Sequence, residues 1–554
     1  MLTEGRRSAD SGFDYIVVGA GSAGCTLADR LTEDGQAHVL LLEAGGWDRD
    51  PQIRIPLAWG RLVTRRRHDW GFDSEPEPNL ADRRIECARG KVIGGSSSIN
   101  AFAHVRGHPM DFDRWAARGC TGWSYAEVLP YFRRLERWEH GADAFRGAAG
   151  PIAVCVSRYP DPIVDAWIEA GRQAGFPGVS DYNGAGQEGF ARSQCTIARG
   201  RRCSAADAYL RPALSRRNLR VRTRARVTRV LVRSGRAVGV EFVAREGRGT
   251  VSAAREVILC AGAILSPQLL MLSGVGAPDA LRAHGIAVAA SLPGVGQGLQ
   301  DHLAAGIDFA RLRPGPFASV MRADRILREL ARAYLLGRGF ATWLPGGWVA
   351  FLRTAHDKTL PDVQLMFRAA PMTARPYSGL FGVPFQDDFG CRAVLLRPAS
   401  RGEVMLASAD PLAAPRIRQN FLAAGDDLAV LRAGLRLIRE VAAQPALRPF
   451  IGRELAPGPT AIDDVSLDRH VRRTAVTAHH PAGTCRMGPE RDRMAVVDPL
   501  LRVHGIEALR VIDASVMPDL TGGNINAPVL MLAERAADLI RGRTMDGNGE
   551  GAGS

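Results

Sequence analysis

The chain has 554 residues, too many for one hydrophobic core, so we expect at least two domains. Its formal net charge is +14, and of its 72 basic residues only Lys91 and Lys358 are lysines. The arginines are spread along the chain without a basic run interleaved with aromatic residues. This pattern argues against nucleic-acid binding and leaves peripheral contact with an anionic membrane surface as the more credible consequence of the charge.

The cysteine pattern and the lack of long apolar runs predict where in the cell the protein lies. There are nine cysteines, an odd number, and no CxxC pair, so we predict neither a metal site nor a disulfide framework. Residues 1–12 lack the apolar segment of a secretion signal, and no run of about 18 apolar residues predicts a membrane span. We therefore expect a cytoplasmic protein, with residues 544–554 as a disordered tail.

The first expected elements form a strand, a turn and a helix within residues 13–46. A β-branched run leads into Gly19, Gly21 and Gly24, the GxGxxG pattern of a dinucleotide-binding turn. A second apolar run ends in Glu43, whose carboxylate can accept hydrogen bonds from a ribose. The motif alone fits FAD and NAD equally. The predicted cofactor contacts in this unit are Gly19, Gly21, Ser22, Ala23, Gly24, Glu43 and Ala44.

A second glycine-rich stretch, residues 89–101, presents a dense row of backbone N–H groups and hydroxyls, which suits a phosphate or a flavin as well as a flexible loop. Residues 89–113, RGKVIGGSSSINAFAHVRGHPMDFD, resemble the first signature of the glucose-methanol-choline (GMC) oxidoreductases, FAD-dependent enzymes that act on alcohols. His104 departs from that signature. The resemblance implies cofactor contacts from Arg89, Gly90, Val92, Gly94, Gly95, Ser96, Asn100 and Ala101.

Other parts of the chain carry the same resemblance. Ile99 stands where some family members have a histidine linked covalently to the flavin, so the resemblance implies non-covalent FAD. Residues 262–276 match the family's second signature, and residues 294–302 resemble the loop that closes its FAD domain. Val227 resembles the residue whose backbone meets the adenine, although a core valine is an equal interpretation.

The resemblance covers residues 13–541 and implies an α/β fold with two domains. The Rossmann-like FAD-binding domain is expected to be discontinuous, with residues 12–158, 199–304 and 473–543. Residues 159–198 and 305–472 are expected to form an α+β substrate-binding domain with an antiparallel sheet. Candidate pocket walls, for each of which core packing is the alternative, are Trp343, Trp348, Phe351, Phe367 and Phe385.

The chemistry is expected near the C-terminus. Two histidines, His479 and His480, precede Pro481, and a neutral imidazole can take a hydroxyl proton near pH 7. Residues 477–488 resemble the family's HPxGT motif, which implies that His480 is the catalytic base. Asn524 resembles the second active-site position and should donate a hydrogen bond to the substrate oxygen, with Asn526 capping the last helix. The implied cofactor contacts here are Asp513, Ala514, Asn524, Ile525 and Asn526.

The leading hypothesis is an FAD-dependent alcohol dehydrogenase or oxidase that converts a primary alcohol to an aldehyde and passes electrons to a quinone-like acceptor or to oxygen. A second hypothesis keeps FAD and makes the chain a lyase, of the hydroxynitrile-lyase or fatty-acid-photodecarboxylase type. Leu396 stands at the position of the photodecarboxylase's cysteine and counts against the latter. A third is a non-catalytic flavoprotein or an NAD-binding protein. Choline would need aromatic faces and a carboxylate, which the sequence does not place.

Overall fold

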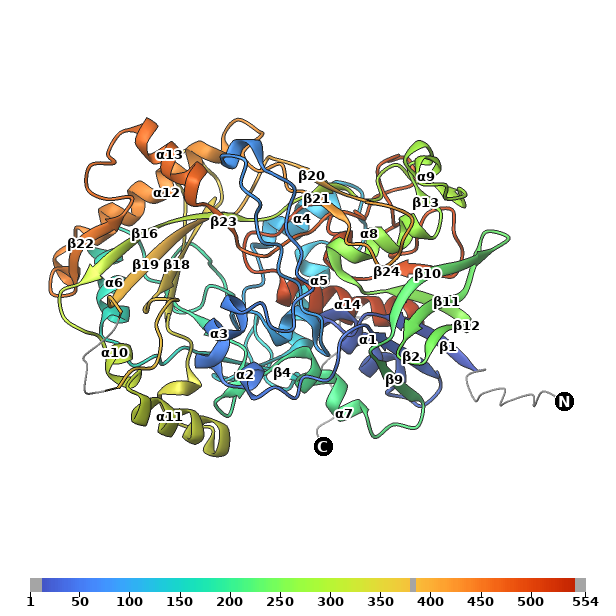
Figure 1. The fold of residues 1–554 in the computed structure, drawn as a ribbon, viewed down its shortest axis with the longest axis horizontal. Coiled ribbons are helices and arrows are strands. Elements are labelled where there is room, and N and C mark those ends of the chain that lie inside the picture. The colour runs from blue at the N-terminus through green and yellow to red at the C-terminus, as the bar shows by residue number, and fades with distance from the viewer. Residues whose placement is uncertain (1–11, 379–384, 544–554) are drawn as a thin grey trace.

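The computed structural model describes residues 12–378 and 385–543, so the tail expected at 544–554 lies outside the described residues. Two large β-sheets stand at opposite ends of the molecule, with helices and long loops between them (Figure 1). None of the helices in these two ranges is both long and apolar enough to cross a bilayer.

The first sheet has a parallel core. Its strands, in spatial order, are β10 (Arg226–Arg233), β11 (Arg236–Ala244), β12 (Gly247–Leu259), β1 (Phe13–Val18), β2 (Val39–Glu43) and β9 (Leu219–Thr223), with β24 (Leu509–Val511) beside β12. Strands β24, β12, β1, β2 and β9 are parallel, and β10 and β11 add an antiparallel hairpin. Strand β2 is buried along its whole length, which explains its unbroken apolar run. The Rossmann-like part of the predicted fold is confirmed.

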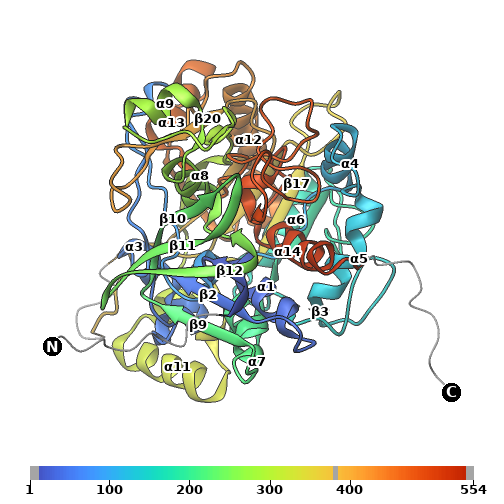
Figure 2. The ribbon, with the colours of Figure 1, turned by 90° about the vertical axis from the view of Figure 1, so that its right-hand side faces the viewer.

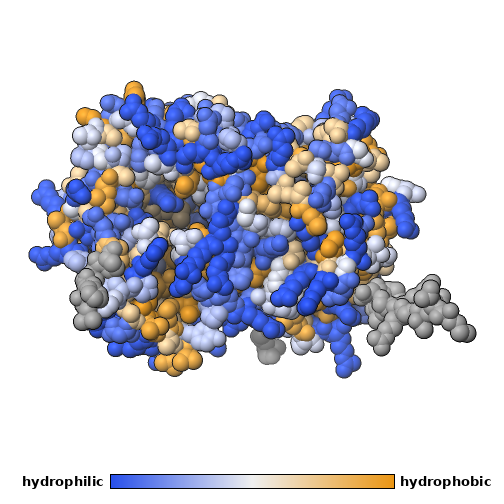
Figure 3. Space-filling model, in the orientation of Figure 1, coloured by the Kyte–Doolittle hydropathy of each residue, from blue (hydrophilic) through white to orange (hydrophobic). Residues whose placement is uncertain are grey.

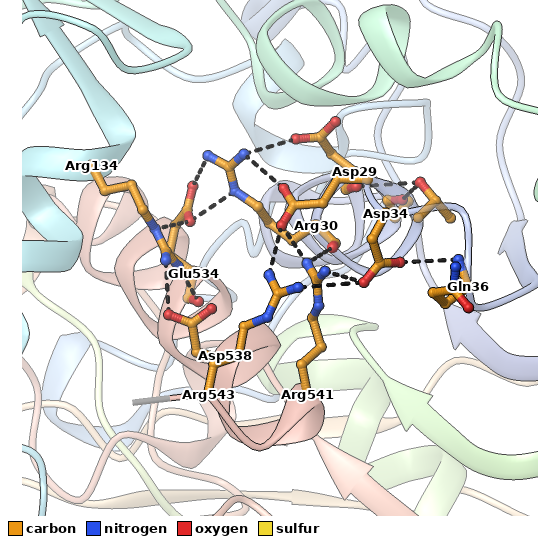
Figure 4. Close-up of polar contacts among 12 residues, drawn as sticks. Asp29, Arg30, Asp34, Gln36, Arg134, Glu534, Asp538, Arg541 and Arg543 are labelled. Atoms are coloured by element: carbon orange, nitrogen blue, oxygen red, sulfur yellow. Dashed lines mark hydrogen bonds and ion pairs between the residues drawn. The ribbon is translucent and has the colours of Figure 1, made fainter. Parts of the chain in front are cut away.

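Helices α1 (Ser22–Thr32) and α14 (Asn526–Arg541) lie together on one side of this sheet (Figure 2). Their contact is built around Glu534, which is fully buried. Its carboxylate accepts two hydrogen bonds of 2.9 Å from Arg30 and one of 2.7 Å from Arg134 (Figure 4). It also accepts a 2.7 Å hydrogen bond from the Tyr209 hydroxyl. Two helices that are far apart in sequence are therefore joined by a buried carboxylate whose hydrogen bonds and charge are provided for by its neighbours.

The second sheet is antiparallel. Its strands, in spatial order, are β22 (Ile451–Ala456), β16 (Leu303–Arg311), β19 (Asp388–Leu395), β18 (Val363–Arg368), β17 (Trp348–Leu352) and β5 (Gly189–Arg192), with β23 (Val476–Thr477) beside β16. Helices α6 (Ile163–Gln173), α12 (Asp427–Ala442) and α13 (Asp464–Thr474) cover one face and share its core. The expected antiparallel sheet with helices is confirmed. Its other face is turned toward the middle of the molecule.

Shorter elements connect the two sheets. The remaining helices are α2 (Pro51–Arg54), α3 (Trp59–Thr64), α4 (Pro109–Ala117), α5 (Tyr125–Leu135), α7 (Arg211–Ala213), α8 (Gly262–Leu272), α9 (Pro278–Ala283), α10 (Pro316–Val320) and α11 (Ala323–Leu336). The remaining strands are β3 (Glu136–Trp138), β4 (Ile152–Val156), β6 (Gln194–Cys195), β7 (Ile197–Ala198), β8 (Arg201–Arg202), β13 (Val275–Gly276), β14 (Ala290–Ser291), β15 (Gln297–Leu299), β20 (Gly402–Met405) and β21 (Arg416–Arg418).

The last helix begins differently from its predicted start. Asn526 is the first residue of α14, and Ile525 occupies the N-cap position without a side-chain cap. The Asn526 side chain instead accepts a 2.7 Å hydrogen bond from the Ser22 hydroxyl at the start of α1. The capping prediction is therefore wrong, because this asparagine serves a tertiary contact between two helix N-termini.

Candidate active site

A cavity of about 1590 Å³ lies between the two sheets. On one side it is bounded by the carboxyl ends of β1 and β2 and by the N-termini of α1 and α14. On the other side it is bounded by the free face of the antiparallel sheet. A crevice beyond the carboxyl ends of parallel strands is the usual ligand position in an open α/β sheet.

The first glycine turn has the geometry that a diphosphate requires. Gly19 has a φ of +99°, and a Cβ there would lie 2.6 Å from the Cys260 carbonyl oxygen. A Cβ on Gly24 would lie 1.9 Å from the Gly19 oxygen, so Gly24 permits the close packing of α1 and does not line the cavity. The nearest atom to a Cβ on Gly21 is 4.0 Å away. Open space therefore meets the backbone at Gly21, next to the helix N-terminus.

The second glycine stretch lies directly on the first. The Gly94 N–H donates to the Ala20 oxygen at 2.7 Å, and a Cβ on Gly95 would lie 2.6 Å from the Gly21 Cα. Gly94 and Val92 do not line the cavity; Val92 packs in a small apolar cluster. The other predicted cofactor contacts line the cavity: Gly19, Gly21, Ser22, Ala23, Glu43, Ala44, Arg89, Gly90, Gly95, Ser96, Asn100, Ala101, Val227, Asp513, Ala514, Asn524, Ile525 and Asn526.

Two carboxylates help to shape the cofactor side. Glu43 accepts hydrogen bonds from the backbone N–H groups of Ala20, at 2.9 Å, and Gly45, at 2.7 Å, and burial raises its pKa to about 7. Asp513 accepts from the Gly262 N–H at 2.9 Å and the Ser266 hydroxyl at 2.6 Å. Two helix N-termini, an open glycine backbone and a carboxylate at the end of β2 together fit a dinucleotide such as FAD.

His480 and Asn524 meet at the boundary between the cofactor side and the antiparallel sheet. The Asn524 Nδ2 lies 3.1 Å from the His480 Nε2, and the Asn524 Oδ1 accepts a 3.3 Å hydrogen bond from Gln364. The His480 N–H donates to Asp301 at 2.7 Å. Burial is the main cause that lowers the pKa of His480 well below its ordinary value, so the ring is neutral at neutral pH.

The sequence interpretation missed His302. Its Nδ1 lies 2.9 Å from the His480 Nδ1, and its Nε2 lies 3.1 Å from the Leu396 carbonyl oxygen. Burial lowers its pKa to about 4. The signal was an Asp301-His302 pair at the end of the glycine-rich stretch 294–302, which was assigned only a closing role.

His479 is placed differently from its neighbour. Its backbone has a φ of +63°, and its carbonyl accepts a 2.7 Å hydrogen bond from Arg89. Burial is the main cause that lowers its pKa to about 3. The ring also lines the cavity, but its Nδ1 has no hydrogen-bond partner among the described residues.

The predicted pocket walls divide between cavity and core. Phe367 lines the cavity. Trp348 and Phe351 are buried in separate core clusters, while Trp343 and Phe385 pack at the edges of others. The core interpretation was therefore correct for most of them.

Comparison with known families gives matches along most of the chain. A family model described as GMC oxidoreductase matches residues 13–304, and a second with the same description matches residues 398–533. The oxygen-dependent choline dehydrogenase of Photobacterium profundum is 42% identical over 536 residues, which are 96% of this chain and 93% of that protein. The protein of the same description from Rhizobium johnstonii is 43% identical and covers 96% of each chain.

Solved structures of similar fold include two oxidases. Pyridoxine 4-oxidase from Mesorbium loti has a TM-score of 0.86 and 34% identity, covering 96% of this chain and 100% of that one. Formate oxidase from Aspergillus oryzae has a TM-score of 0.86 and 27% identity, covering 97% and 99%.

Proposed function

The chain belongs to the GMC oxidoreductase family, as an FAD-dependent enzyme that oxidises the CH–OH group of an alcohol, and we propose that His480 removes the hydroxyl proton while Asn524 holds the hydroxyl oxygen. The observation that carries this proposal is a continuous hydrogen-bond chain from the Leu396 carbonyl through His302 and His480 to Asn524.

The chain of hydrogen bonds fixes which nitrogen of His480 carries a proton. The Leu396 carbonyl can only accept, so the His302 Nε2 must be the protonated nitrogen and donate to it. In neutral His302 the Nδ1 is then an acceptor, and the proton between the two rings belongs to the His480 Nδ1. The His480 Nε2 is left with a free electron pair, which receives the Asn524 amide. That electron pair makes Nε2 the base.

A substrate hydroxyl that enters between these two side chains would donate its proton to the His480 Nε2 and accept from the Asn524 Nδ2. When bound, FAD supplies the acceptor for the hydride that leaves the carbinol carbon. The N-terminus of α14, which lines the same cavity, favours negative charge placed next to it. Ile99 lines the cavity without a nucleophilic atom, in agreement with non-covalent FAD.

The lyase alternative is not favoured. The relatives and structural neighbours described above are named as dehydrogenases and oxidases. Leu396 is fully buried in a core cluster, and its carbonyl holds His302. The proposed electron acceptor is oxygen or a quinone-like molecule.

A membrane surface is the second partner that we propose, and α11 is the element that would meet it. The side chains of Leu327, Leu335 and Leu336 are 68%, 70% and 67% exposed. Figure 3 shows hydrophobic side chains gathered along the lower edge of the molecule, where Figure 1 places α11. Residues 322–338 also contain five arginines against Asp324 and Glu329.

The charges around α11 favour an anionic bilayer over a neutral partner. Asp324 is paired with Arg322, and Glu329 is buried and paired with Arg332. Among the described residues no carboxylate pairs with Arg325, Arg328 or Arg338. A helix with exposed leucines beside unpaired arginines has the composition of one that lies in a membrane interface. Its inner face, with Ile326 and Leu330, lines the cavity.

The base is tested by replacing it. His480→Ala should lower the rate of anaerobic flavin reduction by alcohol about 10²–10⁴-fold, the usual contribution of a general base, with FAD still bound. The residual rate should rise with pH as hydroxide takes over the role. His479→Ala is the matched control and should stay much closer to wild type. Wild-type flavin reduction by His480→Ala would show that this histidine is not the base.

A further inference from the structure

Arg392 stands on the cavity face of the antiparallel sheet. Along β19 the residues alternate: Phe389, Cys391, Ala393 and Leu395 belong to the core under the helices, whereas Gly390, Arg392 and Val394 line the cavity. Gly306 lies opposite Arg392 on β16, and a Cβ there would lie only 2.9 Å from the Arg392 Cγ. The glycine therefore leaves room for the arginine side chain.

The guanidinium of Arg392 has no hydrogen bond or ion pair with any described residue. Its side chain is exposed within the cavity, and burial away from bulk water lowers its pKa. Its neighbour Arg368, on β18, differs, because its guanidinium bonds to Asp308 at 2.6 Å and to Asp388 at 2.7 Å. One guanidinium on this face is therefore bonded directly to carboxylates of the protein, whereas the other is not.

The unpaired charge lies close to His479, the residue that precedes the candidate base. Strand β19 pairs with β16, and β16 pairs with β23, the strand that leads directly into His479 and His480. Val394, two residues from Arg392, lies opposite Ala304, which in turn lies opposite Val476. The charge of Arg392 contributes to the lowered pKa of His479. A substrate held over His480 therefore has Arg392 within its surroundings.

We propose that the substrate is an alcohol that carries one carboxylate, and that Arg392 binds this carboxylate while His480 and Asn524 engage the hydroxyl. The inference rests on the proposed function. A guanidinium matches a carboxylate with two parallel hydrogen bonds, and such charge-assisted bonds are strong away from water.

The surroundings of Arg392 favour a monoanion and disfavour a cation. Met366 lies directly opposite Arg392, and the other cavity residues of this region are mostly apolar: Ala304, Leu344, Pro345, Phe367, Val394 and Val476. A quaternary ammonium group next to Arg392 would thus meet an unpaired positive charge, and the carboxylate of Asp308 on this face is already bonded to Arg368. A phosphate dianion would be neutralised only in part.

The test compares substrates that differ only in charge. Anaerobic flavin reduction is measured on the FAD-loaded enzyme with ω-hydroxycarboxylates of increasing length, with 1-alkanols of matched length, and with choline. The best hydroxycarboxylate should exceed its matched alkanol in kcat/KM by about 10- to 100-fold, the size of a bidentate charged hydrogen bond. Arg392→Gln should abolish this advantage and leave the alkanol rates nearly unchanged, and Arg392→Lys should restore part of it.

Two controls separate the possible failures. Arg61→Gln removes an exposed arginine on α3 at the margin of the same cavity and should leave the preference intact. Calorimetric titration with hexanoate should show binding that Arg392→Gln loses, independent of turnover. Preference for choline or alkanols, or an equal effect of Arg61→Gln, would overturn the carboxylate proposal while alcohol oxidation stands. If no alcohol reduces the flavin, the proposed function fails and this inference falls with it.

Discussion

At the scale of single residues, the Nδ1–Nδ1 contact between His302 and His480 determines the chemistry of both rings. Only one of the two nitrogens can carry the bridging proton, and the carbonyl of Leu396 decides which. Asp301 fixes the backbone of His480, because its carboxylate accepts hydrogen bonds from the His480 backbone N–H and from the Thr477 hydroxyl. The base is therefore oriented from two directions before any substrate arrives.

Replacement of His302 should affect catalysis only through the orientation of the His480 ring. In His302→Leu the His480 Nδ1–H loses its acceptor, so the ring can adopt the wrong tautomer, and we expect kcat to fall about tenfold, the worth of one such hydrogen bond. KM and FAD content should change little. His302→Asn offers an amide oxygen to His480 and an N–H to Leu396, so it should recover most of the loss. Equal damage in both variants, with a raised KM, would indicate a packing role instead.

The pH profile follows from the burial of His480. A general base must be neutral to accept a proton, and burial lowers the pKa of this ring well below its ordinary value. Activity should therefore be retained as the pH falls through 6.5, the ordinary histidine value, and should be lost only at lower pH. The measurement is kcat/KM for alcohol against pH. An acid limb at or above pH 6.5 would contradict a buried histidine base.

At the scale of elements, the sequence pattern predicted those features that depend on interactions between residues close together in the chain. The apolar runs of β1 and β2 and the glycine turn between β1 and α1 were visible because strand burial and backbone conformation are local properties. The start of α14 could not be predicted in this way, because Asn526 bonds to Ser22, which lies 504 residues earlier. A proline inside a helix is intrinsically unfavourable, yet α8 begins at Gly262 and continues through Pro267. Buried packing outweighs the intrinsic preference at both sites.

The contact between α1 and α14 should depend on Glu534. Glu534→Ala removes the fully buried carboxylate that Arg30, Arg134 and Tyr209 share, and loss of one partner of a buried ion pair costs about 3 kcal/mol in comparable cases. We expect a lower melting temperature and weaker FAD retention, because both helix N-termini line the cavity.

A second acidic residue at the same helix pair provides the control. Asp34 pairs with Arg541 at the surface, as Figure 4 shows, and Asp34→Asn should cost less than about 1 kcal/mol. Equal destabilisation by both changes, measured as melting temperature of the holoenzyme, would contradict the special position of Glu534.

At the scale of the whole molecule, the site joins segments that the sequence separates by hundreds of residues. The glycine turn, residues 89–101 and the pair His480 and Asn524 were each identified, but only the family resemblance placed them around one cofactor. Arg392 and His302 escaped notice, since an unpaired charge and a ring-to-ring hydrogen bond exist only once two sheets face one cavity. Contact with an anionic membrane was predicted from the net charge alone, and the sequence did not assign it to α11.

The α11 surface gives the last prediction. Purified holoenzyme should float with vesicles of phosphatidylcholine that contain phosphatidylglycerol, more weakly at high salt, and should not float with phosphatidylcholine alone. The double change Leu327→Ser and Leu335→Ser should lower the partition coefficient about tenfold or more, because it removes two side chains that would enter the interface. Arg328→Gln should lower it about fivefold.

Matched controls lie near the start of α13, which is at the top of Figure 1 whereas α11 is at the bottom. There Ile462 and Val465 are 71% and 67% exposed. Their replacement by serine removes comparable apolar surface from a site without the arginines of α11, so vesicle binding should be unchanged. The leucine changes should also leave alcohol-dependent flavin reduction in solution unaltered, since neither side chain lines the cavity. The wild-type protein could instead fail to bind anionic vesicles and form a dimer that the same leucine substitutions dissociate. In that case α11 is a subunit interface and the membrane assignment is wrong.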